Sequence, residues 1–132
     1  MRLSDIMTHP VETIDKNEFA EHAWNRMRRQ RIHHLVVTDP VDGIIGVLSD
    51  RDLAGPNGAL LRGDWIVADA MTPHPMCVPP NMTVRQAANL LRGRSIGCLP
   101  IVENGKLIGI VTVSDLLEVV GRGSVRPWRR AQ

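Results

Sequence analysis

Apolar side chains recur at helical spacing in two parts of this chain. In the second half, Thr83 and Gln86 form a capping box at the start of such a stretch. The apolar positions on one side of the expected helix are Val84, Ala87, Ala88 and Leu91. The matching positions of the first half are Ala20, Ala23, Trp24 and Met27, with Asn17 as the candidate cap. The pattern predicts one amphipathic helix in each half.

Short apolar runs with the composition of β-strands follow each of these helices. They cover residues 35–38 and 44–48 in the first half, and residues 99–102 and 107–111 in the second. An Asp-Gly pair joins the first two runs and an Asn-Gly pair joins the second two. Both pairs are typical of tight hairpin turns, so each half is expected to contain one β-hairpin.

The two halves are copies of one another. An offset of 64 positions superimposes Asp5-Ile6-Met7-Thr8 on Asp69-Ala70-Met71-Thr72, and an offset of 63 superimposes residues 45–53 on residues 108–116. The lost residue falls in the hairpin turn, where a change in length is tolerated. We expect a first repeat at 1–54, a linker at 55–67, a second repeat at 68–121 and a basic, flexible tail at 122–132.

Each repeat is expected to run β-α-β-β-α. The last helix of the second repeat is predicted from Thr112 through Val120 to a stop at Gly121. Its counterpart in the first repeat is short, because Gly55 and Pro56 end it. About 50 residues bury too little apolar surface for a stable core. The sequence therefore predicts an α+β fold in which two repeats pack sheet to sheet with quasi-twofold symmetry.

Composition narrows the functional classes. The 132 residues are 43% hydrophobic, and charges interrupt every apolar stretch, which predicts a soluble protein without membrane segments. Two cysteines without a C-x-x-C motif fit a reducing cytoplasm. The net charge of +2 is too small to indicate a polyanionic partner. We find no catalytic triad, P-loop or metal-ligand motif, so we expect neither an enzyme nor a metal site.

The segment that opens the last helix of each repeat carries the candidate chemistry. It reads Gly-Val-Leu-Ser-Asp-Arg-Asp-Leu at 46–53 and Gly-Ile-Val-Thr-Val-Ser-Asp-Leu at 109–116. A Ser or Thr at a helix N-cap leaves backbone N–H groups that attract an anion such as phosphate. An Asp three residues later can accept hydrogen bonds from the two ribose hydroxyls. The same spacing is also an ordinary helix start, so both interpretations stay open.

The doubled Asp-x-Met-Thr opening, the order of elements and the two [ST]-x-x-Asp segments resemble a CBS-domain pair, also called a Bateman module. The resemblance covers residues 1 to about 121. It implies a non-enzymatic regulatory module that binds an adenosine-type nucleotide in the crevice between its repeats. The candidate ligands are AMP, ADP, ATP and S-adenosyl compounds, and no further cofactor is implied.

Carried over by position, the resemblance implies two ligand sites. One combines Thr112 and Asp115 with Thr8, Thr13 and Ile14. The other combines Ser49 and Asp52 with Thr72, Cys77 and Val78. Arg51 is a candidate phosphate contact, and so are His33 and His34, which lie where some family members place phosphate-binding side chains. For the two histidines, imidazoles that simply cap a strand are an equal alternative.

Family resemblance also bears on the partners. We expect a homodimer, because CBS pairs commonly associate through their helices, and a separate effector protein whose identity the sequence leaves open. One alternative is a dimeric interaction module that binds no ligand. The other is contact with nucleic acid through the arginine-rich tail, which we do not favour because glycine, serine and proline indicate a flexible end. Trp24 and Trp65 are expected in the core or an interface.

Overall fold

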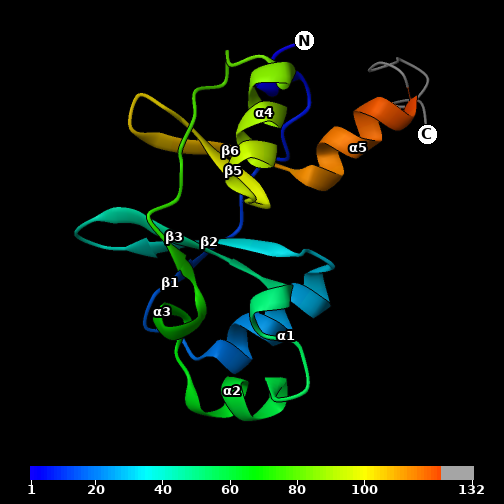
Figure 1. Ribbon diagram of the computed structural model, residues 1–132. Helices are drawn as coiled ribbons and strands as arrows, with labels where there is room; N and C mark the ends of the chain where they lie inside the picture. The colour runs from blue at the N-terminus through cyan, green and yellow to red at the C-terminus, as the bar shows by residue number, and fades with distance from the viewer. Residues whose placement is uncertain (123–132) are drawn as a thin grey trace. The chain divides into compact units, whose positions relative to one another are not determined.

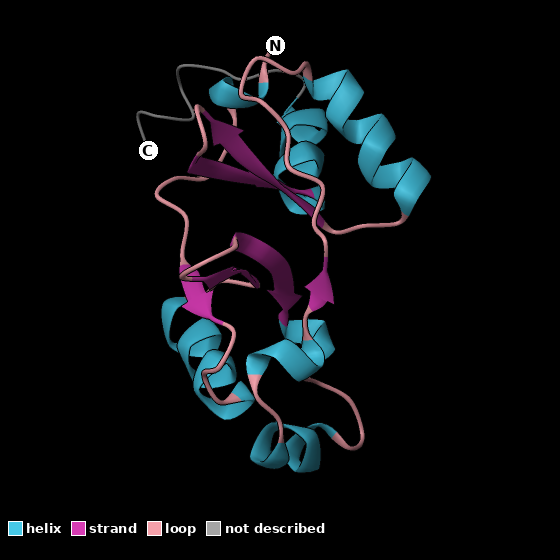
Figure 2. Ribbon diagram, turned by 90° about the vertical axis from the view of Figure 1, so that its left-hand side faces the viewer, coloured by secondary structure: helices cyan, strands magenta, loops and turns pink. Residues whose placement is uncertain are grey.

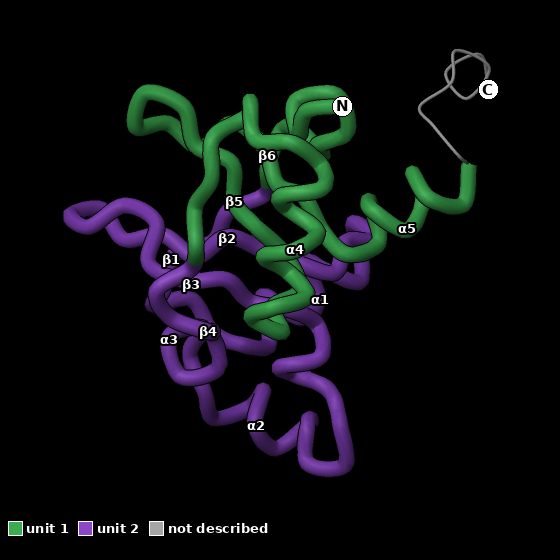
Figure 3. The backbone as a smooth tube through the Cα atoms, turned by 45° about the horizontal axis from the view of Figure 1, so that its top comes forward, with its two compact units in different colours: residues 1–11, 76–132 green, residues 12–75 purple. Residues whose placement is uncertain are grey.

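Two β-sheets organise residues 1–122, the part of the chain that the computed structural model describes (Figure 1). The sheets belong to two compact units (Figure 3). Unit 1 comprises Met1–Val11 and Met76–Gln132, and unit 2 comprises Glu12–Pro75. Each unit thus contains residues of both predicted repeats. The predicted basic tail lies, apart from Arg122, outside the described residues.

Unit 2 contains a four-stranded sheet in the order β1-β2-β3-β4. Its strands are β1 (Thr13–Asp15), β2 (His34–Asp39), β3 (Gly43–Ser49) and β4 (Thr72–Pro73). The first pair is parallel and the other two are antiparallel. The helices lie on one face of the strands (Figure 2). They are α1 (Ala20–Gln30), the 3-10 helix η2 (Asp50–Asp52), α2 (Gly58–Asp64) and α3 (Val67–Ala70).

Unit 1 repeats this arrangement around an antiparallel hairpin. The hairpin consists of β5 (Cys98–Glu103) and β6 (Lys106–Thr112). Single bridges add a segment on either side, since Val78 pairs parallel with Ile101 and Thr8 pairs antiparallel with Ile110. The helices of this unit are the 3-10 helix η1 (Leu3–Asp5), α4 (Val84–Arg94) and α5 (Val113–Arg122). The parallel, antiparallel, antiparallel order of unit 2 is therefore present here as well.

Local sequence signals account for most of these elements. All four predicted hairpin strands are confirmed to within one residue at each end. Asn104 and Gly105 both adopt positive φ, at 52° and 77°, as the tight turn of a hairpin requires. The capping box of α4 is also confirmed, because Gln86 N–H donates to Thr83 Oγ1 at 3.1 Å and Thr83 N–H donates to Gln86 Oε1 at 3.0 Å.

One predicted helix cap was wrong, and one predicted helix end differs by a single residue. Helix α1 does not use Asn17 as a cap, because the N–H of Ala20 donates instead to the carbonyl of Trp65 at 2.8 Å. A tertiary hydrogen bond thus replaces the local one. Helix α5 does not stop at Gly121 but continues to Arg122. The predicted linker, in addition, carries the two-turn helix α2.

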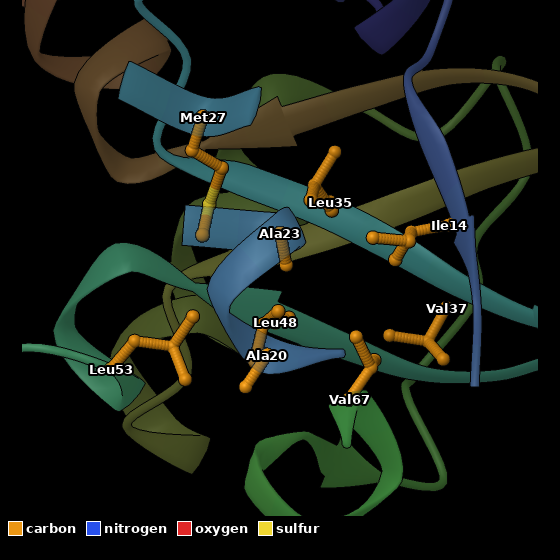
Figure 4. Close-up of a cluster of buried hydrophobic side chains, with 9 residues drawn as sticks. All are labelled: Ile14, Ala20, Ala23, Met27, Leu35, Val37, Leu48, Leu53 and Val67. Atoms are coloured by element: carbon orange, nitrogen blue, oxygen red, sulfur yellow. The ribbon is translucent and has the colours of Figure 1, made fainter. Parts of the chain in front are cut away.

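Each unit has its own hydrophobic core. The buried cluster of unit 2 lies between α1 and the sheet (Figure 4) and comprises Ile14, Ala20, Ala23, Met27, Leu35, Val37, Leu48, Leu53 and Val67. The cluster of unit 1 comprises Leu3, Ile6, Val78, Ala87, Leu91, Leu99, Ile101 and Val111. Trp24 and Trp65 pack against the first cluster, so their predicted core role is confirmed.

The β2–β3 hairpin is anchored by the carboxylate of Asp39. Lys16 Nζ lies 2.5 Å from its Oδ2, and the backbone N–H groups of Val41 and Asp42 donate to its Oδ1 at 2.7 and 3.2 Å. The hydrogen bond from Lys16, supported by these backbone bonds, lowers the pKa of Asp39 to about 2. The carboxylate is therefore ionised at neutral pH, and it ties β1 to the hairpin through Lys16.

The methionine of each Asp-x-Met-Thr segment packs on a glycine of the other predicted repeat. A Cβ added to Gly46 would lie 2.5 Å from Sδ of Met71 and 2.9 Å from the carbonyl oxygen of Thr72. A Cβ added to Gly109 would clash with Sδ of Met7 and lie 3.0 Å from its Cγ. At Gly46 the backbone carbonyl of Thr72 leaves room only for glycine, whereas at Gly109 the Met7 side chain would have to move to admit a methyl group. Each copy of the Asp-x-Met-Thr motif thus packs on one copy of the glycine segment.

We predict that Gly46→Ala and Gly109→Ala each lower the free energy of unfolding by about 1–3 kcal/mol, because the added methyl group overpacks the contact. Gly93→Ala in α4 is the matched control, since a Cβ there meets nothing within 4 Å. The control should be neutral or more stable by up to about 1 kcal/mol, because alanine favours a helix. Denaturant unfolding measures all three. Equal stability of Gly46→Ala and Gly93→Ala would contradict the account, because the Cβ at Gly46 meets a backbone oxygen.

Candidate functional site

Each [ST]-x-x-Asp segment lies where the second hairpin strand of a unit ends and a helix begins. Ser49 ends β3 and Asp52 ends η2, whereas Thr112 ends β6 and Asp115 lies in the first turn of α5. Asp52 Oδ2 accepts the N–H of Ser49 at 2.8 Å, and Asp115 Oδ2 accepts the N–H of Thr112 at 2.9 Å. Both acids therefore cap the helix start, as one of the two interpretations predicts.

Capping alone does not distinguish these acids from others in the chain. Asp5 Oδ2 accepts the N–H of Arg2 at 2.8 Å, and Asp69 Oδ2 accepts the N–H of Ile66 at 3.0 Å. Neither of those caps carries a hydroxyl side chain. A carboxylate has about four lone-pair positions, so one backbone bond leaves capacity for further donors. What sets Asp52 and Asp115 apart is the Ser or Thr beside an oriented carboxylate.

The hydroxyl is used differently in the two copies. Thr112 Oγ1 accepts the N–H of Asp115 at 3.2 Å, while among the described residues the Ser49 side chain makes no cap hydrogen bond. The following helix is ten residues long after Thr112 and three residues long after Ser49. The Thr112 segment is therefore the better fixed of the two, as the sequence indicated.

The backbone N–H groups expected to attract phosphate are partly occupied. The N–H of Val113 donates to the carbonyl of Gly97 at 3.1 Å, and the equivalent N–H of Asp50 donates to the carbonyl of His33 at 3.0 Å. These bonds tie each segment to the start of its hairpin. An anion at either segment would depend more on hydroxyl and side-chain donors than the sequence suggested.

Strand pairing brings a threonine of the Asp-x-Met-Thr motif alongside each segment. Thr8 exchanges two backbone hydrogen bonds with Ile110, at 2.9 and 3.0 Å, two residues before Thr112. Thr72 pairs with Val47, two residues before Ser49. Side chains alternate between the two faces of a strand. Each threonine therefore lies on the same sheet face as the Ser or Thr of its segment, opposite to the buried core residue that precedes that Ser or Thr. Unit 1 thus gathers Thr8 with Thr112, and unit 2 gathers Thr72 with Ser49.

The other predicted contacts lie in the opposite unit from their expected partners. Thr13 and Ile14 belong to unit 2, whereas Cys77 and Val78 belong to unit 1. Several of their main-chain groups are occupied: Arg26 Nη1 donates to the Thr13 carbonyl at 2.6 Å. The N–H of Val78 donates to the Pro100 carbonyl at 3.0 Å, and the Val78 carbonyl accepts the N–H of Val102 at 2.9 Å. Ile14 and Val78 are buried and Cys77 is exposed.

The histidine pair lies beside the Ser49 segment. His33 Nδ1 is 2.7 Å from Asp50 Oδ2, and His34 stands opposite Ser49 in the β2–β3 register. The imidazole of His33 therefore has a carboxylate partner with which a phosphate would compete. Arg51, the neighbouring cation, is exposed. Unit 1 has Gly97 and Cys98 at the positions equivalent to the two histidines, so this polar cluster occurs in unit 2 and not at the matching place in unit 1.

Within residues 1–122, no group of three or more histidine, cysteine or acidic side chains is arranged to hold a metal ion. None of the helices in the same range is long and apolar enough to cross a membrane.

Sequence reasoning missed three features that matter here. It did not foresee the methionine–glycine contacts, although the matched spacing of both motifs was a signal for them. It overlooked the pairing of Asp50 with His33. It also assigned no role to the polar face of α1, which lines the pocket of about 280 Å³ described below.

Comparison with known proteins assigns the family. The sequence profile of the CBS domain matches residues 3–55 and again residues 67–122. The chain belongs to the CBS-domain family. Both matches include one [ST]-x-x-Asp segment, so the α+β fold with two CBS repeats is confirmed.

The region similar to this chain makes up most of one relative and a small part of another. The CBS domain-containing protein YhcV of Bacillus subtilis is 32% identical over 116 residues, which are 86% of this chain and 81% of YhcV. Inosine-5'-monophosphate dehydrogenase of Korarchaeum cryptofilum is 33% identical over 119 residues, which are 87% of this chain and only 23% of that enzyme. A crystal structure of CBSX2 in complex with AMP has a TM-score of 0.75 at 26% identity and covers 92% of this chain and 97% of CBSX2.

Proposed function

We propose that this protein is a regulatory module that binds an adenosine nucleotide and signals to a separate effector protein. AMP, ADP, ATP and S-adenosyl compounds share the adenosine group that the proposal requires. The observation that carries it is the paired arrangement of a hydroxyl, an oriented carboxylate and a second threonine, which occurs once in each unit. CBSX2, which is solved with AMP, supports the same ligand class.

The side chains of the two [ST]-x-x-Asp segments offer the hydrogen-bond donors and acceptors that the ribose and phosphate of a nucleotide require. The carboxylates of Asp52 and Asp115 are held in place by backbone bonds and act only as acceptors, which suits the two hydroxyls of a ribose. The hydroxyls of Ser49 and Thr112 can donate to a phosphate. Thr13, Ile14, Cys77 and Val78 stay proposed contacts for the base and its surroundings.

Catalysis is not part of the proposal. CBS sequence accounts for most of the chain, and the dehydrogenase relative matches it over less than a quarter of that enzyme. We therefore propose a non-enzymatic role, and we place it in the cytoplasm because the chain's two cysteines are thiols, as a reducing compartment favours. The alternative of a ligand-free interaction module would be favoured if adenosine compounds fail to bind at millimolar concentration. The proposed nucleic-acid contact concerns residues outside the described range.

The group around Thr112 and Asp115 should bind the nucleotide more tightly. Losing a hydrogen bond to a charged group costs about 1.5–3 kcal/mol, so Asp115→Ala should weaken AMP binding by at least about tenfold in titration calorimetry. Asp52→Ala should weaken it less, because the shorter helix and Asp50 leave that group less favourable to phosphate.

Matched controls separate ligand contact from the loss of a helix cap. Asp5→Ala and Asp69→Ala remove the same kind of backbone cap, in unit 1 and unit 2 respectively, without a neighbouring cap hydroxyl. Both variants should bind AMP with an affinity within about twofold of that of the unaltered protein. Such a change is smaller than the loss of a charged hydrogen bond would cause. A larger loss for Asp52→Ala than for Asp115→Ala would reverse the ranking. Unchanged binding in both would remove the ribose role.

We also propose a homodimer, with α5 in its interface. Val113, Leu117 and Val120 are 42%, 65% and 76% exposed and recur at helical spacing, so they form one apolar stripe. Sedimentation of the protein at micromolar concentration should give twice the mass of one chain, and Leu117→Glu should shift it towards the single chain. The control is Leu60→Glu, since Leu60 is 71% exposed on a different helix. A single-chain mass for the unaltered protein would refute the dimer.

A further inference from the structure

Helix α1 turns a polar face towards a pocket that shares only Ile14 with the proposed nucleotide contacts. The pocket has a volume of about 280 Å³ and is lined by Ile14, Glu18, His22, Asn25, Arg26 and Arg29. All six residues belong to unit 2. The four from α1 follow the spacing i, i+3, i+4 and i+7, so they share one face of the helix. We propose that this pocket binds a small phosphate ester that carries hydroxyl groups.

This pocket lies on a different side of the sheet from the [ST]-x-x-Asp segment of unit 2. Ile14 is buried in the cluster between α1 and the sheet (Figure 4), so its side chain points to the helical face. Ser49 neighbours the core residue Leu48 and therefore points to the opposite face. The pocket is thus separate from the Ser49 group, and the proposal does not rest on nucleotide binding.

Arg26 is held in a fixed orientation at the pocket. Its Nη1 donates to the Thr13 carbonyl at 2.6 Å, and its Nη2 donates to Glu12 Oε1 at 3.0 Å. A guanidinium has five N–H donors in a rigid plane, so two bonds leave others for a ligand. The side chain is only 28% exposed, which limits the solvent screening of its charge. An oriented, partly buried guanidinium is well suited to a phosphate.

Arg29 supplies the second cation, one turn further along α1. Within residues 1–122 its side chain has no hydrogen-bond or ion-pair partner. Its charge is therefore available, whereas Glu12 offsets part of the charge of Arg26. Two guanidinium groups at i and i+3 on one helix face can hold one phosphate between them.

The remaining lining residues suit hydroxyl groups rather than a second anion. Glu18 is an acceptor-only carboxylate, with His22 Nδ1 3.7 Å from its Oε1, and Asn25 offers both donors and an acceptor. Ile14 provides an apolar floor. The volume lies just below the range of about 300–1,000 Å³ typical of pockets for drug-sized ligands. A short phosphorylated polyol matches this combination of charge, acceptors and size.

Amide chemical shifts of the full-length protein test the proposal residue by residue. Titration with inorganic phosphate and with glycerol 3-phosphate should shift the amides of residues 22–29 saturably, and the ester should bind more tightly because its hydroxyls reach Glu18 and Asn25. Arg29→Gln should weaken both ligands by about tenfold, as expected for the loss of a charged hydrogen bond. Weaker binding of the ester than of inorganic phosphate would overturn the hydroxyl assignment.

Arg28→Gln is the matched control. It removes the same charge from the same helix, but Arg28 lies over the Trp24 ring at 5.7 Å and does not line the pocket. The affinity of this variant for both ligands should stay within about twofold of that of the unaltered protein. Such a change is smaller than the loss of a charged hydrogen bond would cause. Equal weakening by both substitutions would show unspecific attraction to a basic helix. Shifts confined to residues 49–52 or 112–115, or no saturable shift at millimolar ligand, would overturn the pocket assignment.

Discussion

In both units a methionine packs closely on a glycine, and this contact joins residues of the two predicted repeats. Met7 reaches Gly109 in unit 1, and Met71 reaches Gly46 in unit 2. The threonine after each methionine then pairs with the strand that leads into an [ST]-x-x-Asp segment. The close approach therefore completes the sheet and, at the same time, brings the second threonine to the candidate ligand group.

Local patterns were sufficient to predict most of the fold. The hairpins, the α4 capping box and the difference in length between α5 and η2 all follow from short-range signals in the chain. The start of α1 did not follow, because its first N–H is satisfied by Trp65, which is distant in sequence. The linear pattern also did not give the association of residues 1–11 with the second hairpin, because strand partners are set by tertiary contacts. Only the family resemblance placed Thr8 with Thr112.

The sequence was sufficient to name candidate site residues, whose ligand role stays a prediction, but it did not predict their hydrogen bonds. The capping interpretation of the [ST]-x-x-Asp motif is confirmed for both acids. The ligand interpretation stays a prediction, and it is compatible with the cap because each carboxylate keeps acceptor capacity. The pairing of His33 with Asp50 depends on the β2–β3 register, and the use of the Val78 main chain depends on its bridge to Ile101. Such details require strand partners, so composition and spacing could not supply them.

Native mass spectrometry of the full-length protein tests the central claim, adenosine recognition, most directly. The protein would be incubated with an equimolar mixture of AMP, ADP, ATP, S-adenosylmethionine and GMP and then freed of unbound ligand. The account predicts a mass increase that corresponds to one of the adenosine compounds, with no GMP retained. Retention of GMP in preference to every adenosine compound, or no retained ligand at millimolar concentration, would contradict it.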